Sequence, residues 1–170
     1  MKLLMLMIFL VHVASTQCAA LPPDGDLIVR ICRQTPFYDL CISSLKSKPQ
    51  SSGADVTGLA LIMVDELKTK ATETLNHVNG LLHGNPRLKR PLRSCADKYR
   101  AVIGGDIPEA VEALQKGNPK FAEQGANDAA DEAGSCEDGF SGSGGSPLTE
   151  KNKAVHDVAA VAAAIVRNLL

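Results

Sequence analysis

The sequence predicts an all-α protein: an N-terminal helical hairpin, then an up-down-up-down four-helix bundle, with two disulfides cross-linking the chain. Three observations support this fold class. Apolar residues recur at steps of three and four over long stretches, the period of a helix that buries one face. No segment of any length alternates apolar and polar residues as a half-buried strand does. The expected connections are short, which favours antiparallel neighbouring helices.

Residues 1–20 have the features of a secretory signal. Lys2 supplies the positive charge, and the apolar run "LLMLMIFLV" that follows is too short to span a bilayer. Small residues allow cleavage after Ala20. A membrane anchor is the alternative interpretation of this segment, and no other stretch of the chain is apolar enough to be one.

Removal of residues 1–20 takes away one cation and no acid. The remaining chain then has 18 − 1 = 17 Lys and Arg against 19 Asp and Glu, a net charge of −2. This balance argues against a nucleic-acid partner, because no Arg-rich patch offsets it. The 150 residues from 21 to 170 are expected to form one helical domain, with the hairpin at 21–50 and the bundle at 55–170.

The hairpin is expected to contain two short helices. Asp26 is placed to cap the first, and Thr35 followed by Pro36 is typical of the start of the second. Cys32 and Cys41 lie on either side of this turn, so a tight hairpin would bring their sulfurs together.

Four helices are expected to form the bundle. The first runs from about 55 to 83, and the second begins near 91 and is interrupted at "GGDIPEA", where Asp106 and Glu109 have the spacing of a capping box. The third begins at Asn118, and the fourth begins at Ser146. Their apolar seams are Leu59, Met63, Leu67, Ala71, Leu75, Val78 and Leu82; Leu92, Ala96, Tyr99 and Ile103; Ala122, Ala126, Ala129, Ala133, Cys136 and Phe140; and Leu148, Val155, Val158, Ala162, Ile165 and Leu169.

Removal of the signal also removes Cys18, so the secreted chain keeps four of the five cysteines. An even number of cysteines in a secreted chain predicts two disulfides, for which three pairings exist. Folding the second and third helices back on each other at Gly117 brings Cys95 and Cys136 to similar heights, since each lies about 30 Å from the turn at 1.5 Å per residue. The predicted pairs are therefore Cys32–Cys41 and Cys95–Cys136.

The sequence offers no enzyme active site. It has no metalloprotease, hydrolase, nucleotide-binding or dinucleotide-binding motif, so no catalytic residue, metal or cofactor is expected. His77 and His83 are six residues apart, on different sides of a helix, and His156 lies one position off an apolar seam. The basic run "RLKRPLR" at 87–93 has two interpretations, a solvated connection between helices or a contact with an acidic partner.

The segment "GNPKFAEQG" at 117–125 is the candidate binding site. Asn118 is a good N-cap and Pro119 a good first helical residue, which places the cation of Lys120 at the positive end of the helix dipole, where it is unfavourable. Phe121 is one residue away from the alanine seam. We therefore expect an ammonium and an aromatic ring to project together from a stiff turn. The alternative is that Phe121 folds back onto the end of the bundle and Lys120 is an ordinary surface cation.

Across nearly the whole mature chain, the sequence resembles the plant invertase and pectin methylesterase inhibitor family. The resemblance rests on "ICRQTPFYDLC", "LALIMVDELKTKA", "PLRSCADKYRAVI", "IPEAVEAL", "GNPKFAE", "SCEDGF" and "AVHDVAAVAAAIVRNLL". It implies the same fold, a hairpin joined to a four-helix bundle with two disulfides. The Pro-Lys-Phe motif resembles the invertase-inhibiting branch, in which this motif enters the substrate cleft of the enzyme.

The resemblance implies a secreted inhibitor of an acid invertase of the cell wall or vacuole. Pro119, Lys120 and Phe121 would enter the sucrose-binding cleft, with Asn118, Glu123 and Gln124 at its rim. Inhibition of pectin methylesterase through helix faces is the alternative. A secreted carrier of apolar ligands is a third hypothesis, which the tight packing expected of an alanine seam disfavours. No nucleic acid and, after removal of the signal, no membrane is expected as a partner.

Overall fold

The computed structural model describes residues 25–170, so the expected signal at 1–20 lies outside the described residues. Within them the chain is helical and contains no strand, which confirms the all-α fold class. The α-helices are α1 (Gly25–Cys32), α2 (Tyr38–Lys46), α3 (Val56–Leu81), α4 (Lys89–Ala101), α5 (Ile107–Gln115), α6 (Pro119–Asp138) and α7 (Thr149–Val166). Short 3₁₀ turns lie at Pro49–Ser51, Pro86–Leu88 and Arg167–Leu169.

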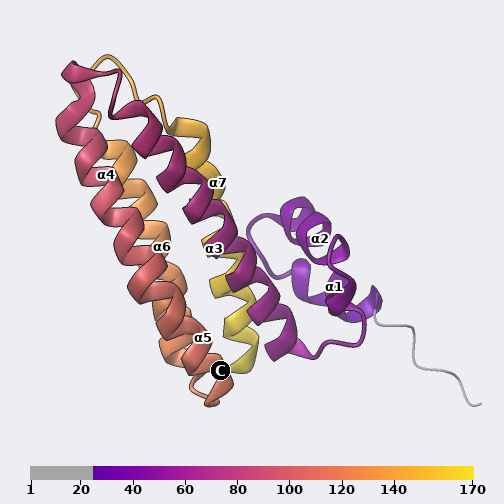
Figure 1. Ribbon diagram of the computed structural model, residues 1–170. Helices are drawn as coiled ribbons and strands as arrows, with labels where there is room; N and C mark the ends of the chain where they lie inside the picture. The colour runs from indigo at the N-terminus through magenta and orange to yellow at the C-terminus, as the bar shows by residue number, and fades with distance from the viewer. Residues whose placement is uncertain (1–24) are drawn as a thin grey trace, which may run out of the picture.

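The bundle consists of four rods that alternate in direction (Figure 1). They are α3, the α4–α5 rod, α6 and α7, and the C-terminus lies at the same end as the turn between α5 and α6. We call this end the C-terminal pole. We call the other end, where α3 leads into α4 and α6 leads into α7, the basic pole, after Arg87, Lys89, Arg90 and Arg93. The α1–α2 hairpin lies beside the bundle.

The core is built from the helix seams that the sequence predicts. All six residues of the third seam are buried, five of them on α6 and Phe140 just after its end, and α6 makes its most extensive contact with α7. Because the α6 seam is mostly alanine, the two helices can approach closely. On α3, Leu75 and Leu82 are only partly buried, while Thr74 is buried and donates its hydroxyl to the Lys70 carbonyl oxygen at 2.8 Å.

The two helices of the hairpin begin at other residues than the sequence predicts. The first helix already begins at Gly25, so Asp26 lies inside it. The Thr35 hydroxyl does not cap α2 but donates to the Cys32 carbonyl oxygen at 2.8 Å, at the end of α1. As a result α2 begins only at Tyr38. Thr35 therefore ends the first helix and does not start the second.

The hairpin is cross-linked internally and also held to the bundle. A disulfide joins Cys32 to Cys41, whose Cα atoms are 5.5 Å apart. The ammonium of Lys153 on α7 lies 5.4 Å from the centroid of the Phe37 ring, a cation–π distance. Lys48, which follows α2, pairs with Glu66 on α3 at 3.1 Å.

The interruption expected within the second helix of the bundle is instead a continuous π-helical stretch, Val102–Asp106. Asp106 has helical backbone angles and makes no side-chain capping bond, so the predicted capping box is wrong. The helix widens by one residue here and does not stop. Gly125 of α6 packs against this stretch, where an added Cβ would lie 2.6 Å from the Asp106 carbonyl oxygen. The absence of a side chain at Gly125 is what lets α6 lie this close.

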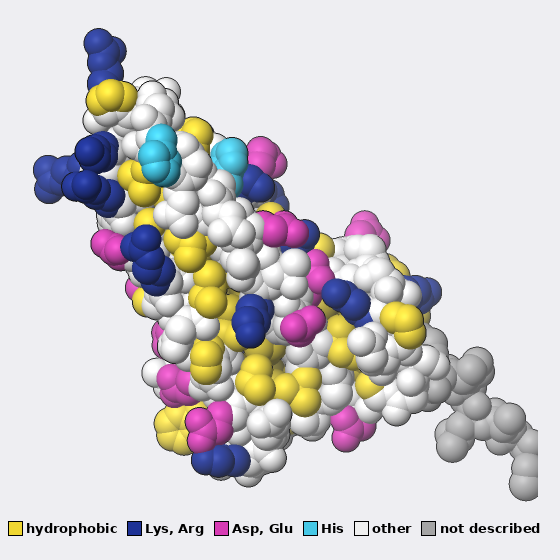
Figure 2. All heavy atoms as spheres, viewed as in Figure 1, with side chains coloured by type: hydrophobic (Ala, Val, Ile, Leu, Met, Phe, Trp, Pro, Cys, Tyr) yellow, Lys and Arg dark blue, Asp and Glu magenta, His cyan; other side chains and the backbone are white. Residues whose placement is uncertain are grey.

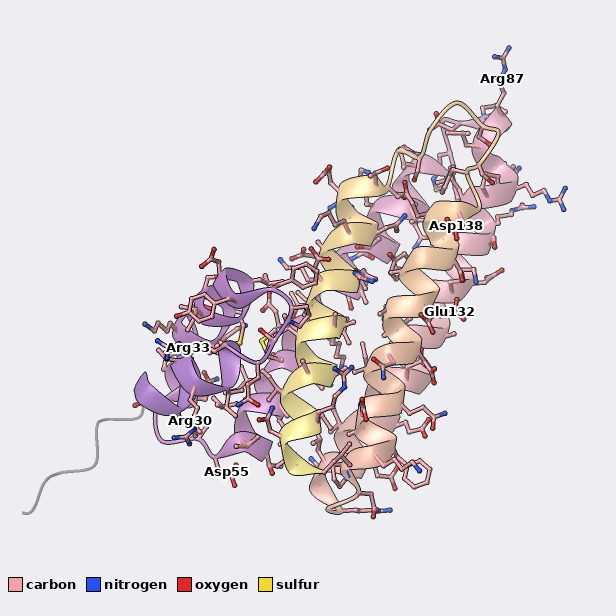
Figure 3. The ribbon with its side chains drawn as sticks, turned by 180° about the vertical axis from the view of Figure 1, so that it is seen from behind. Arg30, Arg33, Asp55, Arg87, Glu132 and Asp138 are labelled. Carbon is pink, nitrogen blue, oxygen red and sulfur yellow. A yellow bond between two sulfur atoms is a disulfide. The ribbon has the colours of Figure 1, made fainter. Side chains whose placement is uncertain are left out.

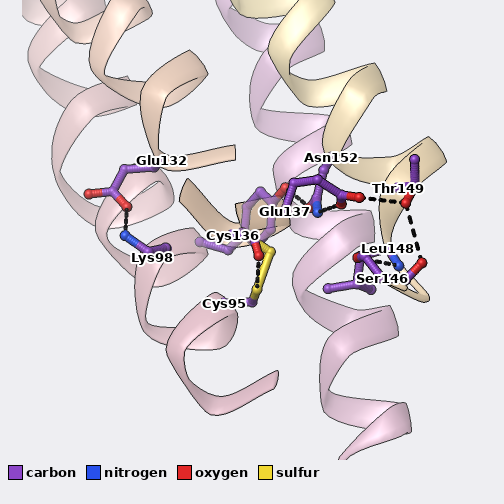
Figure 4. Close-up of a disulfide and its surroundings, with 10 residues drawn as sticks. Cys95, Lys98, Glu132, Cys136, Glu137, Ser146, Leu148, Thr149 and Asn152 are labelled. Atoms are coloured by element: carbon purple, nitrogen blue, oxygen red, sulfur yellow. Dashed lines mark hydrogen bonds and ion pairs between the residues drawn. A yellow bond between two sulfur atoms is a disulfide. The ribbon is translucent and has the colours of Figure 1, made fainter. Parts of the chain in front are cut away.

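A buried polar network lies beside the second disulfide, which joins Cys95 of α4 to Cys136 of α6 (Figure 4). The Tyr99 hydroxyl donates to Asn152 Oδ1 at 2.7 Å, and Asn152 Nδ2 donates to Glu137 Oε2 at 2.7 Å. Burial and the charge of Glu137 raise the pKa of Tyr99. Desolvation raises the pKa of Glu137, but hydrogen bonds from Thr149, Asn152 and Ser146 outweigh it and lower that pKa below its usual value.

Candidate functional site

The turn between α5 and α6 has a fixed backbone. Gly117 has a φ of 72°, in the left-handed region that favours glycine. The Asn118 N–H donates to the Ala113 carbonyl oxygen at 2.8 Å, and the Gly117 N–H donates to that of Leu114 at 3.3 Å. These two bonds form the Schellman motif that ends a helix. Pro119 then starts α6 immediately, so the chain reverses with little freedom.

Asn118 occupies the N-cap position of α6, but its side chain makes no capping bond. Its backbone carbonyl oxygen instead accepts from the Phe121 N–H at 3.1 Å. The carboxamide of Asn118 is exposed and thus free to contact another molecule.

Phe121 projects away from the bundle. Its relative exposure is 55%, whereas Ala122 beside it is fully buried. Of the large hydrophobic residues in the described part of the chain, Phe121, Tyr38 and Leu170 are the exposed ones. The alternative in which Phe121 folds back onto the bundle is therefore not what the structure shows.

Lys120 is exposed, and within residues 25–170 it takes part in no ion pair. The other cation of this turn, Lys116, pairs with Glu112 one helical turn earlier. The hydrogen bond from Lys116 and its charge lower the pKa of Glu112. Lys120 is thus left with an uncompensated charge beside the exposed ring of Phe121.

Glu123 is less available than the sequence suggests. Its Oε1 accepts from Nε of Arg167, in the C-terminal 3₁₀ turn, at 2.5 Å. Because this pair lies across the end of the bundle, Glu123 supports the first turn of α6. Gln124 is exposed. Within the described residues, the parts of the candidate site without a side-chain partner are therefore Gln124 and the four residues Asn118 to Phe121, which we call the tip.

A groove that the assigned apolar seams do not predict lies between α3 and α5. Its volume is about 500 Å³, and it is lined by Leu61, Val64, Asp65, Lys68, Ile107, Pro108, Val111, Glu112 and Gln115. Figure 2 shows apolar side chains along the face where α3 and the α4–α5 rod lie side by side. Val111 and Leu61, apolar residues off the assigned seams, were the signal that could have revealed it.

The described residues offer no metal-binding group of three or more His, Cys, Asp or Glu side chains. His77 and His83 are exposed, and His156 Nδ1 lies 3.1 Å from Asp157 Oδ1. Between residues 25 and 170, none of the helices combines the length and apolarity needed to cross a bilayer.

Comparison with known proteins identifies the family. Residues 26–165 match the family described as "Plant invertase/pectin methylesterase inhibitor". The chain is 46% identical over 142 residues to "Cell wall / vacuolar inhibitor of fructosidase 1" of Arabidopsis thaliana, covering 84% of this chain and 68% of that relative. It is 30% identical over 129 residues to "Pectinesterase inhibitor" of Actinidia deliciosa, covering 75% and 69%.

The fold is similar to a solved structure of the same kind. A crystal structure of a mutant form of a pectin methylesterase inhibitor from Arabidopsis superposes with a TM-score of 0.71 at 28% identity, covering 81% of this chain and 93% of that one. Sequence and fold agree, and the chain belongs to the plant invertase/pectin methylesterase inhibitor family.

Proposed function

We propose that this chain inhibits an acid invertase of the cell wall or vacuole by inserting its tip into the sucrose-binding cleft. The observation that carries the proposal is the exposed Phe121 ring next to the unpaired ammonium of Lys120, on a turn fixed by Gly117 and Pro119. The similarity to a relative named as a fructosidase inhibitor supports this target class. The chain itself would reach the enzyme by the secretory route.

The chemistry of the target explains why such a tip would bind. Glycoside hydrolases place two carboxyl groups around the scissile bond and stabilise a positively charged transition state. A site built for developing positive charge attracts an ammonium such as that of Lys120. Phe121 would pack on an apolar wall beside it, and together they would exclude sucrose. Because the turn is already ordered, little conformational entropy is lost on docking.

The test is inhibition of an acid invertase by Lys120→Ala and Phe121→Ala. Aromatic anchors at the centre of an interface commonly contribute 2 kcal/mol or more, so we expect about thirtyfold weaker inhibition for Phe121→Ala. Tyr38→Ala and Lys46→Ala are matched controls, since they remove an exposed aromatic ring and an exposed cation from the hairpin. If both tip variants inhibit as strongly as the parent, the cleft model is wrong.

Pectin methylesterase is the second candidate target. The groove between α3 and α5 favours it, because an apolar helix face suits contact with a broad protein surface. Assaying both enzymes with Val111→Lys separates the two candidates. A loss of esterase inhibition with intact invertase inhibition would assign the groove to the esterase. Inhibition of the esterase alone by the parent would exclude the invertase proposal.

A further inference from the structure

The basic pole, opposite the tip, carries a concentrated positive charge that the proposed inhibition does not use. Its cations are Arg87, Lys89, Arg90 and Arg93, all exposed. Figure 2 shows Lys and Arg side chains gathered at this end, and Figure 3 shows Arg87 projecting from it. Within the described residues none of the four takes part in an ion pair.

The two connections that build this pole contain few acids. Residues 74–96 contain four Lys and Arg and no Asp or Glu, and the connection between α6 and α7, residues 139–148, contains no acid either. Asp138, at the end of α6, lies below Arg87 in Figure 3. The net result is a positive patch on a protein whose residues 21–170 carry a net negative charge.

This patch does not serve helix stability. Lys89 and Arg90 lie in the first turn of α4, which contains no acid, and cations there are repelled by the positive end of the helix dipole. Lys89 and Arg93 are four residues apart and so lie on one face of α4. Arg87, in the preceding 3₁₀ turn, extends this row. It also lines an open hollow together with Gly84, Asn85, Pro86, Leu88 and Ser143.

The spacing of the four cations and their residue types indicate the kind of partner that the basic pole would bind. The cations are spread over the end of the bundle and not gathered around one deep pocket, which suits a polymer with repeated charges better than a single small anion. Three of the four are Arg, whose planar guanidinium pairs with a carboxylate through two parallel hydrogen bonds. The secretory signal expected at residues 1–20 places the chain where acidic polysaccharides occur.

We propose that the basic pole binds a polyuronate, an acidic polysaccharide with one carboxylate on each sugar. The bundle separates this site from the tip, because α3 alone is 26 residues, or about 39 Å, long. The two sites can therefore be occupied together, with the polymer holding the protein and the tip free to reach an enzyme. Binding at this pole does not depend on which enzyme the tip recognises.

The experiment measures binding of the purified secreted protein to immobilised polygalacturonate. We expect binding at about 0.05 M salt that is lost at about 0.5 M, where charges are screened. The fully methyl-esterified polymer, which has no charge, is expected not to bind. The triple variant Arg87→Gln, Lys89→Gln and Arg90→Gln should bind roughly a hundredfold more weakly, since each basic side chain at an anionic surface contributes about a factor of five.

A charge-matched variant provides the control. The control variant carries Arg30→Gln, Arg33→Gln and Lys46→Gln, all in the hairpin (Figure 3 labels both arginines). It loses as many Arg and Lys residues as the test variant, two and one, and should bind like the parent. Both triple variants should keep the circular dichroism and the enzyme inhibition of the parent. Equal weakening of the two variants, absence of binding by the parent at low salt, or capture by phosphatidylserine vesicles but not by the polymer would each overturn the proposal.

Discussion

Nε of Arg167 donates to Oε1 of Glu123 at 2.5 Å, joining the last turn of the chain to the N-terminal part of α6, 44 residues earlier. The pair is partly open to water, with side-chain exposures of 54% for Arg167 and 21% for Glu123. It ties α6, two residues beyond the tip, to the C-terminal 3₁₀ turn. Because of this contact, the Glu123 carboxylate already has a partner within the chain, unlike the Lys120 ammonium.

We expect this pair to contribute modestly. Exposed ion pairs stabilise proteins by less than about 1 kcal/mol. In a double-mutant cycle of Glu123→Gln and Arg167→Gln, urea denaturation should therefore give a coupling energy below that value. Invertase inhibition by either variant should stay within about threefold of the parent, because Gly117 and Pro119 already fix the turn. A loss as large as that for Phe121→Ala would show that Glu123 contacts the enzyme directly.

Gly117→Ala is expected to destabilise the protein. A side chain in the left-handed region that Gly117 occupies costs roughly 1–2 kcal/mol. Gly134→Ala is the matched control, since Gly134 lies inside α6 with nothing within 4 Å of an added Cβ. This control should gain roughly 0.5–1 kcal/mol through helix propensity. The two free energies of unfolding should thus move in opposite directions, and a shift of the same sign would contradict the turn geometry.

Tyr99→Phe should destabilise the core without changing its shape. The variant removes the donor to Asn152 Oδ1 and leaves that buried oxygen unsatisfied, at a cost of about 1–3 kcal/mol. Tyr38→Phe removes a hydroxyl from an exposed ring and should change stability by less than about 0.5 kcal/mol. Chemical denaturation of both variants measures the difference, and equal effects would show that the network is not stabilising.

Stability should fall as pH rises between about 4 and 6 through the titration of Asp106. Burial, with the charges of Asp128, Glu132 and Glu109, raises the pKa of this carboxyl from 3.8 to about 6. In that pH range the folded state holds a proton that the unfolded chain has lost, so each further rise in pH favours unfolding. Above about pH 6 the Asp106 carboxyl is ionised in both the folded and the unfolded state, so its contribution to the free energy of unfolding no longer changes with pH.

The Asp106→Asn variant separates the pH-dependent contribution of Asp106 to stability from the contributions of the other carboxyls. Glu137, whose folded pKa is lowered, acts in the opposite sense, because its stabilisation is lost as pH falls through that lowered pKa. The informative quantity is therefore the free energy of unfolding of the variant minus that of the parent, measured at several pH values. It should increase from pH 4 to 6 and then stay constant. Parallel curves for the two proteins would exclude Asp106 as the titrating group.

Periodicity alone was enough to predict the bundle. The seams of α3, α6 and α7 lie inward because a helix that buries one face repeats its apolar residues every three or four positions. Local hydrogen-bonding choices were harder to foresee. The hydroxyl of Thr35 could accept from a backbone N–H of the following helix or donate to a carbonyl of the preceding one, and only the folded hairpin shows that it donates to Cys32. Asp106 likewise had the spacing of a cap, but the helix does not end there.

The polar network was missed for a different reason. The seam assigned to α7 passes from Leu148 to Val155, and this seven-residue step left the inward position of Asn152 unassigned. A buried amide implies partners, but those partners, Tyr99 and Glu137, come from other helices. At the tip, exposure of Phe121 followed from its offset from the alanine seam, whereas the contact of Glu123 with Arg167 could not be read from residues so far apart in the chain.

Alanine is almost the smallest side chain that a helix can bury, so the inner side of α6 has no space for enlargement without pushing α7 away. Larger side chains can consequently be introduced at the solvent-facing surfaces and at the two ends of the bundle without disturbing this packing. The interior of such a scaffold can therefore stay constant while substitutions at its ends change the surface that it presents to a partner.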